Sequence, residues 1–287
     1  MDDERGTSAR VTVHRPRVRY LALLALILVP FLPLFGCTVG PPTFVVYGDS
    51  LLVESKSILE AKLHQMLPEY DIVIHAKAGT TLCDHFYEMQ DDADARNVRG
   101  VAMVFWGNYT TPCITNRPFI QGTADDTNAT IDFWQVRNVP IMFTAAPGRV
   151  DSYPQDRQIW GIGGANIFGF VASIRGVVIV DPTPLFVMSQ STKQYTEQAS
   201  CLVGECTGTI DVRSNDGIHF CSDLYGSTCG TAYSSGSVRY ADTITHGVAA
   251  IMGLPQPPWL EMVTVGGAST SSPGPAPASE VLSPSAA

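Results

Sequence analysis

The segment Phe44-Val45-Val46-Tyr47-Gly48-Asp49-Ser50-Leu51 joins a short apolar run to a turn. Its first four residues are β-branched or aromatic, a pattern typical of a strand buried on both faces. After the turn, apolar residues recur at helical spacing as far as Met66, and Pro68 is expected to end that helix. The segment therefore predicts a strand-turn-helix unit of an α/β fold.

The same alternation continues along the chain. Four more apolar runs are expected as strands, at Ile72–Ile74, Val101–Trp106, Pro140–Phe143 and Val177–Val180. Helical patterns include one that ends near Val136 and a last one at Tyr240–Ile251, before Gly253 and Pro255. Strands that alternate with helices favour a parallel sheet covered on both faces. We therefore predict a three-layer α/β/α sandwich with a five-stranded parallel sheet and right-handed crossovers.

Composition limits the class of protein. The chain has 287 residues, of which 45% are hydrophobic and 16% charged, and this excludes a wholly disordered chain. The formal net charge of -9 provides no basic surface for nucleic acid, so no nucleic-acid partner is expected. Residues 43–254 are predicted as the globular domain. Residues 266–287 are nearly all Ala, Ser, Pro, Gly and Thr, which predicts a disordered tail.

The N-terminus indicates export or anchoring in a membrane. Residues 1–19 form a basic leader with five Arg, and residues 20–37 form an apolar segment. This order predicts a cytoplasmic leader and export of the chain after Cys37. Two interpretations of this segment stay open. Leu34-Phe35-Gly36-Cys37 resembles a bacterial lipoprotein cleavage box, with Cys37 as the lipidated residue. The apolar segment is also long enough to be an uncleaved membrane anchor. The expected location is the extracytoplasmic cell envelope, tethered to the membrane or secreted.

The cysteine count supports export. Besides Cys37 the chain has six cysteines, an even number that an oxidising compartment pairs as disulfides. The pairs we predict are Cys83–Cys113, Cys201–Cys206 and Cys221–Cys229. A zinc site is the alternative, but the sequence contains no CxxC pair, so no metal is expected.

Three residues follow predicted strands, and in parallel sheets sites form beyond the carboxyl ends of the strands. Ser50 follows the first strand at a helix N-terminus, whose partial positive charge favours a developing anion. Gly79 follows the second strand and can offer its N–H, and Asn108 follows the third and can donate its amide. The structural alternatives are that Ser50 only caps the helix, that Gly79 is an ordinary loop glycine and that Asn108 only forms a turn.

The fourth feature is Asp216-Gly217-Ile218-His219, late in the chain. A carboxylate three residues before an imidazole can fold back and accept its N–H, which fixes the ring tautomer and stabilises the imidazolium. The alternative is a surface turn beside an unrelated histidine. Asp242 and His246 form another pair in the last helix, where a structural role is expected. His85 lies close enough to Gly79 in the sequence to contact a substrate.

Together the blocks resemble the SGNH hydrolases, also called the GDSL esterase/lipase family, and indicate an exported bacterial member. The residues that carry the resemblance are, in order, Gly48-Asp49-Ser50-Leu51, Gly79, Gly107-Asn108 and Asp216-Gly217-Ile218-His219. It spans roughly Phe44 to His219 and implies a flavodoxin-like fold with metal-free and cofactor-free ester chemistry. The sequence departs from the family at Tyr109, where an acidic residue is usual.

The resemblance implies a role for each of these residues. Ser50 is the nucleophile, His219 the base and Asp216 its orienting partner, while the Ser50 and Gly79 N–H groups and the Asn108 amide form an oxyanion hole. We therefore expect a serine esterase or acyl hydrolase. Its expected partners are an acylated small molecule, glycan or lipid of the envelope, and the membrane through the N-terminal segment. An acyltransferase that uses a sugar hydroxyl, or a non-catalytic envelope carbohydrate-binding module, stays open.

Overall fold

The computed structural model describes residues 40–105, 111–145, 167–186, 197–214, 216, 218–220 and 234–263. The chain separates into two units, Met1–Gly40 and Pro41–Ala287, and the fold is that of the second unit. The expected N-terminal leader and apolar segment and the expected tail lie outside the described residues. None of the helices in the described ranges is long and apolar enough to cross a membrane.

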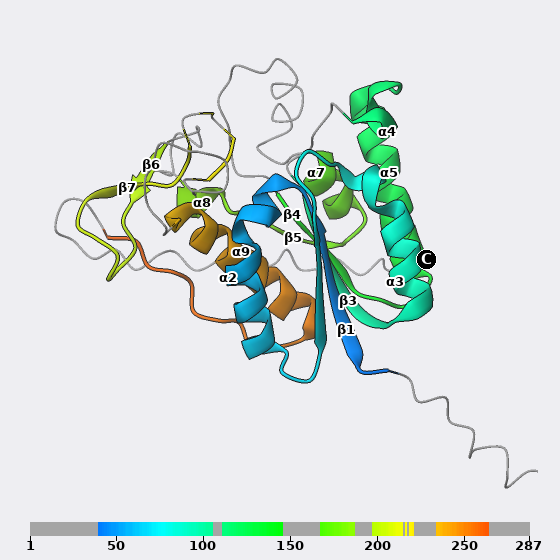
Figure 1. The fold of residues 1–287 in the computed structure, drawn as a ribbon, viewed down its shortest axis with the longest axis horizontal. Helices are drawn as coiled ribbons and strands as arrows, with labels where there is room; N and C mark the ends of the chain where they lie inside the picture. Colours follow the sequence, from blue (N-terminus) through cyan, green and yellow to red (C-terminus); the bar gives the residue numbers. More distant parts are fainter. Residues whose placement is uncertain are drawn as a thin grey trace, which may run out of the picture. The chain divides into compact units, whose positions relative to one another are not determined.

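Five parallel strands form one sheet within the described residues (Figure 1). They are β1 (Pro42–Gly48), β2 (Asp71–Ala76), β3 (Asn97–Val104), β4 (Ile141–Thr144) and β5 (Val178–Val180), in the spatial order β2-β1-β3-β4-β5. The predicted five-stranded parallel sheet is confirmed. β3 begins earlier than predicted, at Asn97, because its backbone already pairs with Pro42 of β1 where its side chains are still largely polar.

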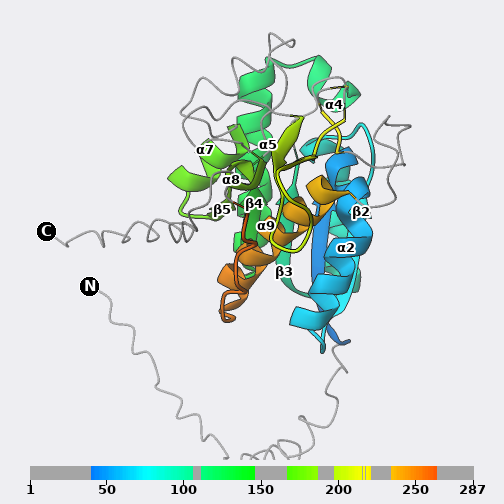
Figure 2. The ribbon, with the colours of Figure 1, turned by 90° about the vertical axis from the view of Figure 1, so that its left-hand side faces the viewer.

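Helices cover both faces of this sheet. One face carries α2 (Ser50–Met66) and α9 (Ser235–Met252), which lie side by side (Figure 2), and the other carries α3 (Phe86–Ala95), α5 (Phe119–Gln135) and α7 (Ile167–Ile174). Side chains of β1 alternate between the layers, since Phe44 and Val46 pack toward α2 and α9 whereas Val45 and Tyr47 pack toward α5 and α7. The predicted three-layer sandwich is therefore confirmed.

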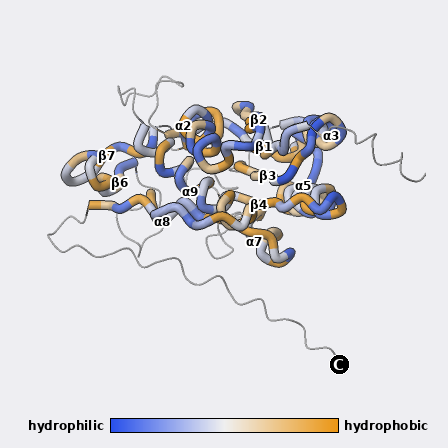
Figure 3. Tube along the Cα trace, turned by 90° about the horizontal axis from the view of Figure 1, so that it is seen from below, coloured by the Kyte–Doolittle hydropathy of each residue, from blue (hydrophilic) through white to orange (hydrophobic). Residues whose placement is uncertain are grey.

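The helices end where the sequence indicates. α2 stops before Pro68, and α9 stops at Gly253, whose φ of 64° is a left-handed conformation that glycine adopts without steric cost. Hydrophobic and hydrophilic stretches alternate along α2 and α5 (Figure 3), as expected of helices that bury one side.

Several short elements have no counterpart in the sequence-based prediction. Besides α3 and α7 they are η2 (Leu82–His85), α4 (Pro112–Thr115), α8 (Thr183–Phe186), β6 (Gln198–Ser200) and β7 (Thr209–Asp211). β6 and β7 form an antiparallel hairpin. The buried Arg239 of α9 donates to the carbonyl oxygens of Leu185 and Ser200 at 2.7 Å each, so α8 and the hairpin are fastened to α9.

Two predicted disulfides are confirmed within the described residues. Cys83 bonds to Cys113, and Cys201 bonds to Cys206. The first bridge joins η2, after β2, to α4, after β3, whereas the second links residues that follow β6 to the turn before β7. The Cys221–Cys229 pair lies outside the described residues and stays a prediction.

We expect the loss of the longer-range bridge to destabilise the fold more than the loss of the shorter one. The sequence separations are 30 residues for Cys83–Cys113 and 5 for Cys201–Cys206. Chain entropy then assigns about 3–4 kcal/mol to the first bridge and about 2 kcal/mol to the second. Urea unfolding of the two double alanine variants measures these values. A larger loss from the Cys201–Cys206 variant would contradict the prediction.

We also expect Gly48→Ala to destabilise the protein. A Cβ at Gly48 would lie 2.3 Å from the carbonyl oxygen of Val104 and 2.8 Å from the Leu52 side chain, and β1 cannot retreat without losing its pairing. Overpacking of this kind costs about 1–3 kcal/mol in the free energy of unfolding. Gly40→Ala is the matched control, because a Cβ there meets nothing within 4 Å. Equal effects of the two substitutions in urea unfolding would show that the close approach is unimportant.

Candidate active site

The carboxyl ends of β1, β2 and β3 lie at the same edge of the sheet. Two backbone hydrogen bonds continue the strand pairing past the strand ends: the Lys77 N–H donates to the Gly48 carbonyl at 3.0 Å, and the Asp49 N–H donates to the Val104 carbonyl at 3.3 Å. Since Ser50 comes directly after this pairing, the start of α2 lies at the carboxyl edge where parallel sheets form their sites.

Ser50 is the first residue of α2 and is buried, with 4% of its surface exposed. The helix is capped by Asp49, whose carboxylate accepts the Leu51 N–H at 3.1 Å. The interpretation of Ser50 as the helix cap is therefore wrong. Its hydroxyl belongs to the first turn, where the helix N–H groups carry a partial positive charge.

The loop after β2 holds Gly79 in a left-handed conformation, with φ of 78°, which glycine favours. Thr80 closes the base of this loop. Its hydroxyl donates to the Lys77 carbonyl at 2.7 Å and lies 3.0 Å from Nε2 of His85. Side chains that lie around Gly79 therefore hold the loop in one shape.

His85 is fully buried where it meets this loop. Its Nδ1 lies 2.6 Å from a carboxylate oxygen of Glu88, which also pairs with Lys77. Burial lowers the pKa of His85 below its ordinary value and outweighs the opposing effect of the Glu88 carboxylate. The contacts observed for His85 are with Thr80 and Glu88, so its role in the structure is to support the loop, and contact with a substrate stays a prediction.

Asp216 and His219 are hydrogen bonded to each other. Nδ1 of His219 lies 2.6 Å from Oδ2 of Asp216, while Oδ1 accepts the N–H groups of Ile218 at 2.8 Å and His219 at 2.9 Å. Burial raises the pKa of Asp216, but these hydrogen bonds together outweigh burial and hold the pKa below its ordinary value. The ionised carboxylate therefore orients the imidazole so that Nε2 is the nitrogen able to take up a proton.

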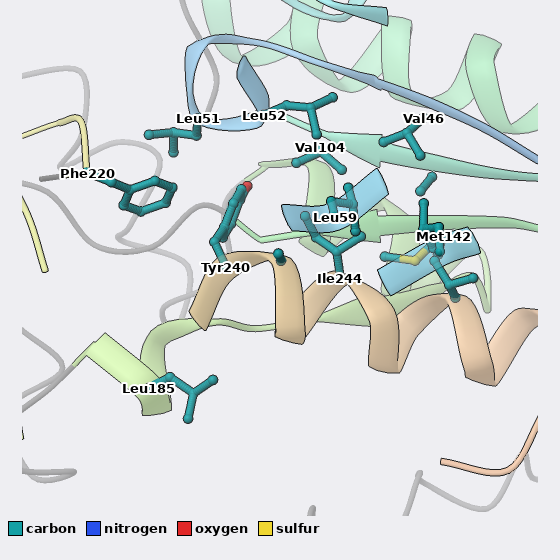
Figure 4. Close-up of a cluster of buried hydrophobic side chains, with 14 of the residues drawn as sticks. Val46, Leu51, Leu52, Leu59, Val104, Met142, Leu185, Phe220, Tyr240 and Ile244 are labelled. Atoms are coloured by element: carbon teal, nitrogen blue, oxygen red, sulfur yellow. The ribbon is translucent and has the colours of Figure 1, made fainter. Parts of the chain in front are cut away.

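A buried glutamate connects this segment to the helix of Ser50. Glu54 lies one helical turn after Ser50, is 6% exposed, and accepts the Phe220 N–H at 2.9 Å through its carboxylate. The Phe220 ring packs against Tyr240 of α9, with ring centroids 5.2 Å apart (Figure 4). His219 therefore directly precedes a residue that is anchored to both α2 and α9.

Sequence reasoning missed Glu54, although its position carries a signal. Glu54 follows Leu51 by three residues and precedes Ile58 by four, so it falls on the apolar face of α2. An acidic residue on such a face needs a buried hydrogen-bond donor. That argument could have marked Glu54 but could not have identified Phe220 as its partner.

Other candidate residues take no part in this arrangement. Asp242 forms an ion pair with Lys62 at 2.8 Å and lies 3.6 Å from His246, whose ring stacks on Trp259, so the second Asp-His pair has the structural role expected of it. Asn108 and Cys37 lie outside the described residues. In the described part of the chain, no three His, Cys, Asp or Glu side chains gather as a metal site.

Comparison with known proteins identifies the fold. No family model matches the sequence, and a search of the curated proteins finds no match. Among solved structures, the acetyl xylan esterase AlAXEase matches with a TM-score of 0.51 and 15% identity over 72% of this chain and 99% of that one. The lipase/acylhydrolase from Enterococcus faecalis matches with a TM-score of 0.50 and 13% identity over 76% and 99%. The α/β fold of this chain is thus one that it shares with an acetyl xylan esterase and a lipase/acylhydrolase.

The buried His85 predicts lower stability in mild acid. Its folded-state pKa is lowered, so as the pH falls below about 6.5 the unfolded chain binds a proton that the folded protein does not. The free energy of unfolding should therefore fall between pH 7.5 and pH 5.5, and urea unfolding at several pH values measures this. His85→Gln should flatten the decline relative to His64→Gln, a control that replaces an exposed histidine. A decline that is the same in both variants would assign it to other groups.

Proposed function

We propose that this chain, built on the fold of known esterases and acyl hydrolases, is a serine esterase that cleaves its substrate through an acyl-enzyme. The observation that carries the proposal is the Asp216–His219 pair, which lies on a segment fastened to the helix that begins at Ser50. A hydroxyl at a helix N-terminus and an oriented imidazole are the groups that nucleophilic acyl transfer requires.

In the proposed reaction, Nε2 of His219 removes the proton of the Ser50 hydroxyl as its oxygen attacks the ester carbonyl. The imidazolium is stabilised by Asp216 and gives its proton to the departing alcohol, which leaves Ser50 acylated. Water then attacks the acyl group while His219 takes its proton, and the return of that proton to Ser50 releases the carboxylic acid.

The oxyanion of each tetrahedral intermediate needs hydrogen-bond donors. We propose the N–H groups of Ser50 and Gly79 and the side-chain amide of Asn108. The shared edge of β1 and β2 and the loop shape imposed by Thr80 support the first two donors. The role of Asn108 rests on its place after β3 in the sequence. The loss of one such donor typically lowers kcat by about 10²–10³-fold.

The proposed substrate is an acylated carbohydrate or lipid ester outside the cytoplasm. Two disulfides in the described residues support export, because disulfides persist in oxidising compartments. An acetyl xylan esterase shares this fold, which supports a small acyl group on a carbohydrate as the first substrate to test. Tethering through residues 20–37, with or without a lipid on Cys37, is part of the same proposal.

Ser50→Ala should abolish esterase activity because it removes the attacking oxygen. We expect kcat on p-nitrophenyl acetate to fall by about 10⁴-fold or more, together with loss of covalent labelling by a fluorophosphonate. Ser55→Ala is the matched control, since Ser55 is a buried serine on the same helix whose hydroxyl donates to backbone carbonyls of its own helix, those of Leu51 at 2.8 Å and Leu52 at 3.5 Å. It should keep both activity and labelling.

Two outcomes would contradict the proposed function. One is full hydrolytic activity in Ser50→Ala. The other is folded wild-type protein that neither hydrolyses acetyl and longer-chain esters nor reacts with the fluorophosphonate, which would favour a carbohydrate-binding role.

A further inference from the structure

The backbone of His219 is hydrogen bonded on both sides within its own segment. Its N–H donates to Oδ1 of Asp216 at 2.9 Å, and its carbonyl oxygen accepts the N–H of Ser214 at 2.8 Å. The imidazole in turn bonds to Oδ2 of Asp216 at 2.6 Å. These bonds fix the shape of the segment and the direction of the ring relative to that segment.

Two buried charged side chains hold the neighbouring peptide groups. The guanidinium of Arg213 donates to the carbonyl oxygen of Ile218, and the carboxylate of Glu54 accepts the N–H of Phe220 at 2.9 Å. Arg213 is 3% exposed and Glu54 6% exposed. His219 therefore lies between a residue held by a cation and a residue held by an anion.

These partners differ in where they come from. Arg213, Ser214 and Asp216 lie within six residues of His219, so their hydrogen bonds to Ile218 and His219 shape the segment from within. The Arg213 N–H also donates to the Glu197 carbonyl at 3.1 Å, which ties the segment to the start of the β6 hairpin and not to α2. Glu54 is 166 residues away from Phe220 and belongs to the helix that begins at Ser50. Of the hydrogen bonds described for this segment, it is the Glu54 bond that sets the position of His219 relative to Ser50.

Packing of the Phe220 ring constrains the position of His219 less than the hydrogen bond to Glu54 does. The Phe220 ring stacks on Phe186 and packs against Tyr240, with centroid distances of 5.5 Å and 5.2 Å. Apolar contacts resist separation but tolerate sliding, because the hydrophobic effect has no direction. A hydrogen bond to a charged acceptor is short and directional. A displacement of about 1 Å at reacting groups can cost about 10²-fold in rate.

We propose that Glu54 is a positioning residue for catalysis: by holding the Phe220 N–H one helical turn from Ser50, it places the imidazole of His219 within reach of the nucleophile. The inference rests on the proposed function, because it requires Ser50 and His219 to react together. The alternative is that Glu54 only satisfies a buried N–H group and contributes to stability without affecting the chemistry.

Conservative substitutions of Glu54 in the full chain separate the two roles. Glu54→Gln keeps a carbonyl acceptor at the same reach, so kcat on p-nitrophenyl acetate should stay within about threefold of wild type. Glu54→Asp keeps the charge but withdraws the acceptor by one methylene, so kcat should fall by about 10–100-fold. KM should hardly change in either variant, because Glu54 is buried and its carboxylate is bonded to the Phe220 N–H. Fluorophosphonate labelling of Ser50 should slow in parallel with kcat.

Leu59→Val is the matched control for stability. Leu59 is fully buried on the same helix and lies in the apolar cluster beside α9. The small cavity should lower the thermal midpoint while kcat stays at the wild-type value. A purely structural role for Glu54 predicts the same behaviour for Glu54→Asp.

The possible outcomes are distinct. Wild-type kcat in Glu54→Asp, together with an inactive Ser50→Ala, would overturn the inference and leave the proposed function standing. Equal losses of kcat in Glu54→Gln and Glu54→Asp would also overturn it, because the acceptor would then not be what matters. An active Ser50→Ala would instead overturn the proposed function, and the inference with it.

Discussion

The constraint on which the rest of the structure depends is the burial of β1 between two strands and two helical layers. Its side chains supply both apolar clusters, with Phe44 and Val46 on one side and Val45 and Tyr47 on the other. Both strand neighbours run parallel to it. A parallel strand must return through a crossover, so the carboxyl ends of β1, β2 and β3 all lie at one edge. The candidate site is a consequence of this geometry.

Polar side chains that are wholly or partly buried then shape the loops at that edge. On one side His85 and Glu88 support Thr80 and hence the turn at Gly79. On the other side Glu54 holds the backbone next to His219. Each of these groups loses hydration when it is buried, and hydrogen bonds to specific partners offset that loss. The apolar core makes the fold stable, whereas these polar contacts select one arrangement of the loops.

Much of the fold could be predicted from the sequence, because its main signals are local. Apolar runs such as Phe44–Tyr47 and Val177–Val180 indicate strands directly, and Pro68 and Gly253 mark helix ends. The helix at Phe86–Ala95 was harder to predict because only Met89 and Asp92 of its residues are buried. Strands of three residues, such as β6 and β7, are too short to display an alternating pattern.

The sequence by itself determined the strand-turn-helix unit at Ser50 and the Asp216–His219 spacing, whereas its even number of cysteines left several pairings open, of which the structure confirms Cys83–Cys113 and Cys201–Cys206 in the described residues. The first two features depend on residues that are neighbours in the chain. Only the tertiary structure decided that Glu54 meets Phe220 and that His85 is enclosed where it supports the loop of Gly79. Such contacts join residues that local pattern cannot relate, because they form only after the sheet has brought distant loops to a common edge.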